Sequence, residues 1–128
     1  MTDLSPFPDL NQAVRAAIGD LVGGDAHTGT VTPSNLQGVL PFIRVQRFGG
    51  ADDLLTDTAR VAVDYFAATY ADAQAGAEAV RQRLITRPLV TAPGVIDRVT
   101  TTLAPHEIPW DDPKVRRFTA TYTVSARR

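Results

Sequence analysis

The chain has 128 residues, of which 44% are hydrophobic and 21% charged, with a formal net charge of -1 and no cysteine. This length and balance are typical of one globular domain and exclude a largely disordered chain. The lack of cysteine excludes a disulfide scaffold, a thiol nucleophile and an iron–sulfur site. The near-neutral charge disfavours a protein that holds duplex DNA on a strongly basic surface.

The sequence contains no segment that suits a membrane. A spanning helix needs about 20 apolar residues, far more than any apolar run here. The N-terminus, MTDLSPFPDL, has an acid where a signal peptide carries positive charge, and no apolar stretch follows it. We therefore expect a protein that is made and used in a cytoplasm, without a membrane partner.

The N-terminal part predicts a helix followed by a long loop. Apolar residues recur at helical spacing over residues 9–22, at Leu10, Val14, Ala17, Ile18 and Leu21. Asp9 suits the first turn of this helix, and Gly23-Gly24 suit its end. Residues 23–38, rich in Gly, Thr, Pro and Ser, predict a loop, with a short strand around residues 28–32 as the alternative.

Two alternating segments predict an antiparallel hairpin. Residues 39–48 (VLPFIRVQRF) and 56–66 (TDTARVAVDYF) each alternate between apolar and polar side chains, as strands with one buried face do. The stretch GGADD between them is typical of a turn.

The C-terminal half predicts a second helix and two strands. Helical spacing over residues 70–85 gives a thin, alanine-rich apolar stripe, so this helix should lie close against a sheet, with Gly76 at a tight contact. Residues 95–103 and 115–127 predict strands, and the proline-rich segment 104–113 predicts a loop. The whole chain, residues 1–128, is thus expected to be a single α+β domain, with a mainly antiparallel sheet and two helices packed on it.

No residue constellation predicts an enzyme, a metal site or a cofactor. The chain has two histidines, His27 and His106, and both fall in predicted loops. Two acidic groups could in principle bind a cation, but each is better read as a polar turn: the first is His106, Glu107, Asp111 and Asp112, and the second is Asp52, Asp53 and Asp57.

The best candidates for function are interface residues. Trp110, the only tryptophan, lies in the proline-rich segment and is either a core anchor for that segment or an interface hot spot. Arg116 and Arg117 begin the last strand, and because adjacent strand residues face opposite ways, at most one of them can line a given face. Arg44 and Arg47 on the first hairpin strand complete the set.

The C-terminal third resembles a known family. The sequence GVIDRVTTTLAPHEIPWDDPKVRRFTATYTVSAR is similar to the end of tail terminator (tail completion) proteins of long-tailed phages of actinobacteria. The shared features are the Gly-x-x-Asp strand at residues 94–97, the Pro-Trp-acidic turn at 109–113 and the Arg-Arg-Phe-x-Ala-Thr-Tyr strand at 116–122. The strand–helix unit at residues 60–84 is also similar, so the resemblance spans roughly residues 38–127.

The resemblance implies an assembly role. Members of this family form a hexameric ring at the head-proximal end of the tail tube, where the ring stops tube polymerisation and presents a surface to head-completion or connector proteins. The implied partners are further copies of the chain, the major tail tube protein and the connector. DNA would pass through the lumen without specific binding, and the near-neutral charge suits such a passage.

The implied location is the tail–neck junction of a virion assembled in a host cytoplasm. Other readings remain open. The chain could be another neck protein, such as a head–tail connector or head-closure subunit, or a small enzyme or ligand-binding domain, or an adaptor that binds a peptide along an edge strand.

Overall fold

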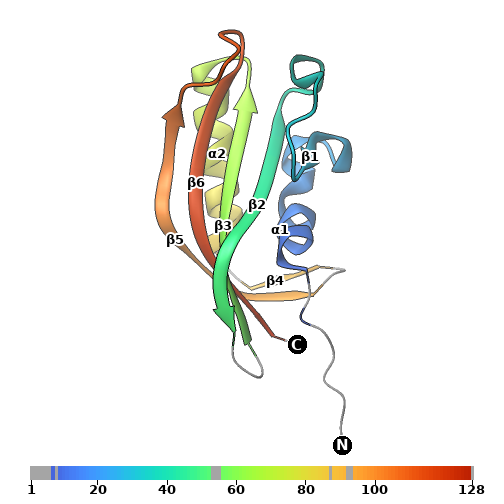
Figure 1. The fold of residues 1–128 in the computed structure, drawn as a ribbon, viewed down its shortest axis with the longest axis vertical. Helices are drawn as coiled ribbons and strands as arrows, with labels where there is room; N and C mark the ends of the chain where they lie inside the picture. Colours follow the sequence, from blue (N-terminus) through green and yellow to red (C-terminus); the bar gives the residue numbers. More distant parts are fainter. Residues whose placement is uncertain (1–6, 8, 53–55, 87, 92–93, 128) are drawn as a thin grey trace, which may run out of the picture.

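The computed structural model describes residues 7, 9–52, 56–86, 88–91 and 94–127. Two α-helices and six strands make up the regular structure (Figure 1). The helices are α1 (Leu10–Ile18) and α2 (Tyr70–Ile85), and three short 3-10 turns span Gly19–Val22, Asp25–His27 and Leu36–Val39. The strands are β1 (Thr28–Gly29), β2 (Phe42–Asp52), β3 (Thr56–Ala67), β4 (Leu89–Val90), β5 (Val95–Ile108) and β6 (Arg116–Arg127).

The six strands form one mixed sheet in the order β1-β2-β3-β6-β5-β4. Only β1 pairs parallel with its neighbour, and every other pairing is antiparallel. The sequence prediction of an α+β fold with a mainly antiparallel sheet is therefore confirmed.

Both helices pack on the same face of this sheet. Strand alternation sends Ile43, Tyr65 and Phe118 toward the helices, because the register places these three residues opposite one another on β2, β3 and β6. They join the apolar stripes of α1 and α2 in one buried cluster. Neither α-helix covers the opposite face, which Figure 1 shows toward the viewer with α2 behind β3 and β6.

The first helix is shorter than the sequence predicts. It begins at Leu10, where the Asp9 carboxylate accepts a hydrogen bond from the Gln12 amide, and its α-helical part ends at Ile18. A 3-10 turn continues it to Val22, and Gly23 closes this turn with φ of 96°, a left-handed conformation that favours glycine. The predicted range of 9–22 was thus right for the helical segment as a whole, but its last turn is 3-10 rather than α-helical.

The second helix matches its predicted range of 70–85. Thr69 caps its N-terminus by accepting a hydrogen bond from the Asp72 amide. Its buried stripe consists of Ala73, Ala77, Val80 and Leu84, and these small residues let the helix backbone approach the sheet closely. The closest approach is at Gly76, where a Cβ atom would overlap the ring of Tyr65.

We expect Gly76→Ala to lower the free energy of unfolding by about 1–2 kcal/mol. Alanine is better than glycine in a helix by about 1 kcal/mol, but overpacking a filled contact costs about 1–3 kcal/mol, so the clash with Tyr65 outweighs the propensity gain. Urea unfolding of both proteins measures the difference. Gly38→Ala is the control, because a Cβ there meets nothing within 4 Å, and its effect should stay within about 0.5 kcal/mol. A Gly76→Ala protein as stable as wild type would contradict the close approach.

An ion pair joins α2 to the turn after α1. Arg83 donates from Nη1 to Asp20 Oδ1 at 2.8 Å and to the Ala17 carbonyl oxygen at 3.0 Å. The hydrogen bond from Arg83 lowers the pKa of the Asp20 carboxyl below its usual value, with partial desolvation acting in the opposite direction.

This pairing predicts a pH-dependent effect of Arg83→Gln. A carboxyl whose pKa is lowered by folding adds stability above its unfolded pKa of about 4, and this contribution is lost as the pH falls through the folded pKa. Because Asp20 is largely exposed, solvent screening keeps the contribution below about 1 kcal/mol. The variant should therefore be slightly less stable than wild type at pH 7, and this difference should shrink as the pH falls below about 4 in urea unfolding. A stability difference that does not change with pH would assign the effect to packing and to the hydrogen bond with the Ala17 carbonyl oxygen instead.

Three predicted segments differ in the structure. The segment 104–113 is not all loop, because β5 continues to Ile108. The strand can contain Pro105 because it lies at an edge of the sheet, and register shifts between Thr101 and His106 leave this proline unpaired. GGADD is not a turn as a whole, since Gly49 to Asp52 still pair with β3; Asp53 lies outside the described residues. The segment 23–38 holds the short strand β1, which the alternative reading anticipated, between two 3-10 turns.

The strand predicted at residues 39–48 begins only at Phe42, after Pro41, and runs on to Asp52. The strand predicted at 95–103 begins at Val95 as expected. The short strand β4, which pairs with its start, was not predicted.

Candidate functional site

Trp110 anchors a second, smaller apolar cluster on the uncovered face of the sheet. The buried members of this cluster are Leu36, Phe42, Phe66 and Val115, with Val39, Leu40 and Trp110 packed partly exposed against them. The Trp110 ring meets Phe66 edge-on, with ring centroids 4.9 Å apart and an interplanar angle of 71°. This packing agrees with the interpretation of Trp110 as a core anchor. Its ring is still partly exposed, so it can also contact another protein.

Two of the predicted arginines lie against this tryptophan. The guanidinium carbon of Arg117 is 5.1 Å from the centroid of the Trp110 ring, and that of Arg44 is 5.8 Å from it. Such cation–π contacts contribute about 0.5–2 kcal/mol each, depending on desolvation. Residues from β2, β6 and the β5–β6 connection therefore meet at one site.

Arg44 is held in place by a buried carboxylate. Its Nε and Nη2 atoms donate to Asp64 Oδ2 at 3.0 and 2.7 Å, and its Nη1 donates to Thr32 Oγ1 at 2.9 Å. Asp64 is only 4% exposed. The register explains the pairing, because Arg44 and Asp64 are directly opposite on β2 and β3.

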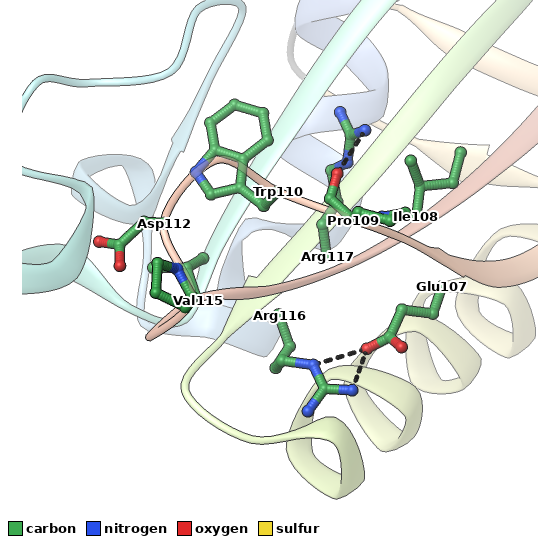
Figure 2. A pocket seen from close by; sticks show the side chains of 9 residues that line it. Glu107, Ile108, Pro109, Trp110, Asp112, Val115, Arg116 and Arg117 are labelled. Carbon is green, nitrogen blue, oxygen red and sulfur yellow. Dashed lines mark hydrogen bonds and ion pairs between the residues drawn. The ribbon is translucent and has the colours of Figure 1, made fainter.

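Arg116 and Arg117 point to opposite faces, as strand alternation predicts. Arg116 turns to the helix side, where it bonds Glu107 at 2.7 Å and lies 5.6 Å over the ring of Tyr70. Figure 2 shows the Arg116–Glu107 pair on one side of the chain and Trp110 on the other. Arg116 therefore belongs to the same region as Trp110 but not to the same cluster.

Arg47 lies elsewhere. It forms a two-pronged ion pair with the buried Asp57, at 2.7 and 2.8 Å, near the closed end of the β2–β3 hairpin. The hydrogen bonds to Asp57 raise the pKa of the Arg47 guanidinium. Because Asp57 is committed to this pair, the acidic group around it has no arrangement in the described residues that suits a cation.

A shallow hollow of about 260 Å³ adjoins Trp110 (Figure 2). It is lined by Glu107, Ile108, Pro109, Trp110, Asp112, Pro113, Val115, Arg116 and Arg117. Within the described part of the chain, Arg117 Nε is buried without a hydrogen-bond partner, while its Nη2 donates to the Pro109 carbonyl oxygen at 3.3 Å. The hollow combines apolar walls with charged rims, which suits a side chain of another protein surface.

The histidines have structural roles in this fold. His27 Nδ1 contacts the carbonyl oxygens of Val39 and Pro41 at 2.7 and 3.0 Å, and His106 Nδ1 contacts that of Ala104 at 2.9 Å. Among the described residues, no group of three or more potential metal ligands forms. Asp112, the other candidate ligand, accepts from the Lys114 amide and from Gln37, and the Lys114 hydrogen bond lowers its pKa.

Neither described α-helix is long and apolar enough to cross a membrane.

The part of the site that sequence reasoning missed is its support on β3, which consists of the buried ring of Phe66 and the buried carboxylate of Asp64. From the sequence, Phe66 and Asp64 were recognised only as residues of an alternating strand. The alternation itself could have indicated that they support a site. Both residues fall on the face opposite Val61, Val63 and Tyr65. A buried phenylalanine on that face must be shielded from water by side chains outside the main core.

Fold and site together define a small α+β domain with one helix-covered face and a small aromatic–arginine cluster on the other. The fold is similar to that of a chain in a solved structure described as the virion of a native gene transfer agent particle. The likeness has a TM-score of 0.65 at 18% sequence identity, and it covers 93% of this chain and 95% of that one. No protein-family model matches the sequence, and no curated protein matches it.

Proposed function

We propose that this chain is a structural protein of a phage-like virion that forms a ring at the head-proximal end of a tail tube. In this role the ring ends tube polymerisation and joins the tail to the head-completion proteins, and the chain has no catalytic activity. The observation that carries the proposal is the fold shared with a chain of a gene transfer agent virion over nearly the full length of both chains. The tail-terminator-like motifs at residues 94–122 support the narrower assignment to the terminator.

The edges of the sheet offer a way to close such a ring. The short β4 pairs only with Val95 and Ile96, so most of β5 forms an open edge among the described strands. On the other side, β1 pairs only with Ile43 and Arg44, which leaves the rest of β2 open. Since β2, β3, β6 and β5 alternate in direction, β5 of one copy would meet β2 of the next copy as an antiparallel neighbour.

The proposal is tested by a stop codon early in the gene of the phage that encodes this chain, followed by negative-stain microscopy of the lysate. We expect tails of uncontrolled length that are not attached to filled heads. Tails of normal length beside unattached heads would instead assign the chain to the head side of the neck, as a connector or head-closure subunit. Intact virions would refute a role in the virion.

Trp110 provides a test at the level of one residue. If its exposed ring edge contacts a neighbouring subunit, Trp110→Ala should weaken ring assembly by about 30-fold, which corresponds to a hot spot of about 2 kcal/mol. Light scattering of the purified protein over a concentration series measures assembly, and circular dichroism establishes that the variant is folded. Tyr70→Ala removes another exposed aromatic ring, on α2, and serves as the matched control. Wild-type assembly of a folded Trp110→Ala protein would exclude this residue from the interface.

A further inference from the structure

The uncovered face of the sheet is polar and rich in hydroxyl groups at the end near the β2–β3 hairpin. Two rows of residues cross it, because the register places Thr58, Ser125 and Arg98 opposite one another on β3, β6 and β5. The next row consists of Arg60, Thr123 and Thr100. Thr102 extends the second row through a hydrogen bond of 2.8 Å to Thr123.

The two arginines of these two rows, Arg60 and Arg98, are free of ion pairs within the described residues. Within the described residues, neither Arg60 nor Arg98 has a carboxylate partner, whereas Arg44, Arg47, Arg81, Arg83 and Arg116 each form an ion pair. The acid that the register places on this face, Asp64, is held by Arg44, and the two rows themselves contain no acid. Although the chain as a whole has a charge of -1, this part of its surface is therefore locally positive.

The backbone beside Arg60 leaves room for a ligand. Arg60 lies opposite Gly49 on β2, and Gly50 follows, so two consecutive residues of that strand carry no side chain. A hollow of about 460 Å³ opens there, lined by Gly50, Ala51, Thr58, Arg60 and Thr123. It places hydroxyl groups and a free guanidinium around one open space.

From these observations we propose that this face binds the phosphate backbone of duplex DNA without reading its sequence. Phosphate oxygens in protein–DNA complexes are contacted chiefly by Arg and Lys together with Ser and Thr hydroxyls, which are the side chains gathered in these two rows. A protein partner fits less well, because the centre of a protein interface is enriched in aromatic residues and depleted in Ser. With two free arginines per copy the binding is weak and strongly salt-dependent.

The test is a titration of the ¹⁵N-labelled protein with a 12-base-pair duplex of arbitrary sequence, followed by NMR at 25 mM and 200 mM salt. We expect amide shifts confined to β3, β5 and β6 around the two rows, and their loss at high salt. Each phosphate contact contributes about −0.9 to the slope of log affinity against log salt. The double variant Arg60→Gln/Arg98→Gln should therefore flatten this slope by about two and weaken binding at 25 mM salt by at least about tenfold.

The matched control is Arg81→Gln/Lys114→Gln, which changes the net charge equally but alters α2 and the β5–β6 connection. Equal weakening in both double variants, shifts spread over the helices, or no shifts at all would overturn the proposal. Poly-glutamate that produces the same shifts at the same charge concentration would also overturn it, in favour of an acidic protein partner. The titration uses free protein, so its outcome does not depend on whether the chain ends tail tubes.

Discussion

Replacing Arg44 by alanine should lower the free energy of unfolding by about 3–5 kcal/mol. The guanidinium makes two hydrogen bonds to Asp64 and one to Thr32, and the Asp64 side chain has little contact with water. Removal of one partner from a buried ion pair leaves an uncompensated charge, and that residual charge dominates the cost. The loss of packing against Phe66 and Trp110 adds to it.

A double replacement separates the two causes. In Arg44→Met/Asp64→Leu no charge remains buried, so stability should recover to within about 1–2 kcal/mol of wild type. Arg81→Ala is the control for arginine truncation in general, because Arg81 forms a surface pair with Glu78, and its cost should stay below about 1 kcal/mol. Chemical denaturation of the four proteins measures all these values. If Arg44→Ala costs no more than Arg81→Ala, the pair is not desolvated in solution.

Elements that alternate or repeat within a few residues of sequence were predictable. Strand β6 alternates Phe118, Ala120, Tyr122 and Val124 with hydroxyl residues, and each apolar residue on it is buried. The α2 helix was found with its range because its apolar stripe is a local signal. In these places local pattern and tertiary burial agree, which is the condition under which sequence reasoning succeeds.

Features that depend on a distant partner were not predictable. The extent of β5 depends on pairing with β6 through three register shifts, and the prolines around Pro105 read locally as a loop. The cluster at Trp110 joins β2, β3, β6 and the connection before β6, and no spacing in the sequence relates these segments. The candidate residues Trp110, Arg44 and Arg117 were chosen one at a time, and the fold brings these three together while Arg47 and Arg116 pair elsewhere.

Phe66→Ala should be the other strongly destabilising substitution, at about 3–5 kcal/mol. Phe66 is completely buried, and its ring contacts those of Phe42 and Trp110, with centroids 6.4 and 4.9 Å away. Because it holds the smaller cluster rather than the main core, the variant should keep the secondary structure while Trp110 becomes more hydrated. Trp110 is the only tryptophan, so its emission reports this directly, and a shift to longer wavelength is expected in the native state.

Phe66→Leu keeps most of the buried volume and should cost less than about 1.5 kcal/mol, with little change in emission. An unchanged emission spectrum in Phe66→Ala would show that Trp110 does not depend on this support.

Since the Arg44 guanidinium lies 5.7 Å from the Phe66 ring centroid, the losses of unfolding free energy in Arg44→Ala and Phe66→Ala should not be additive when the two substitutions are combined. A combined loss smaller than the sum would mean that both residues hold one unit, and that the exposed edge of Trp110 is positioned for its proposed neighbour by side chains buried beneath it.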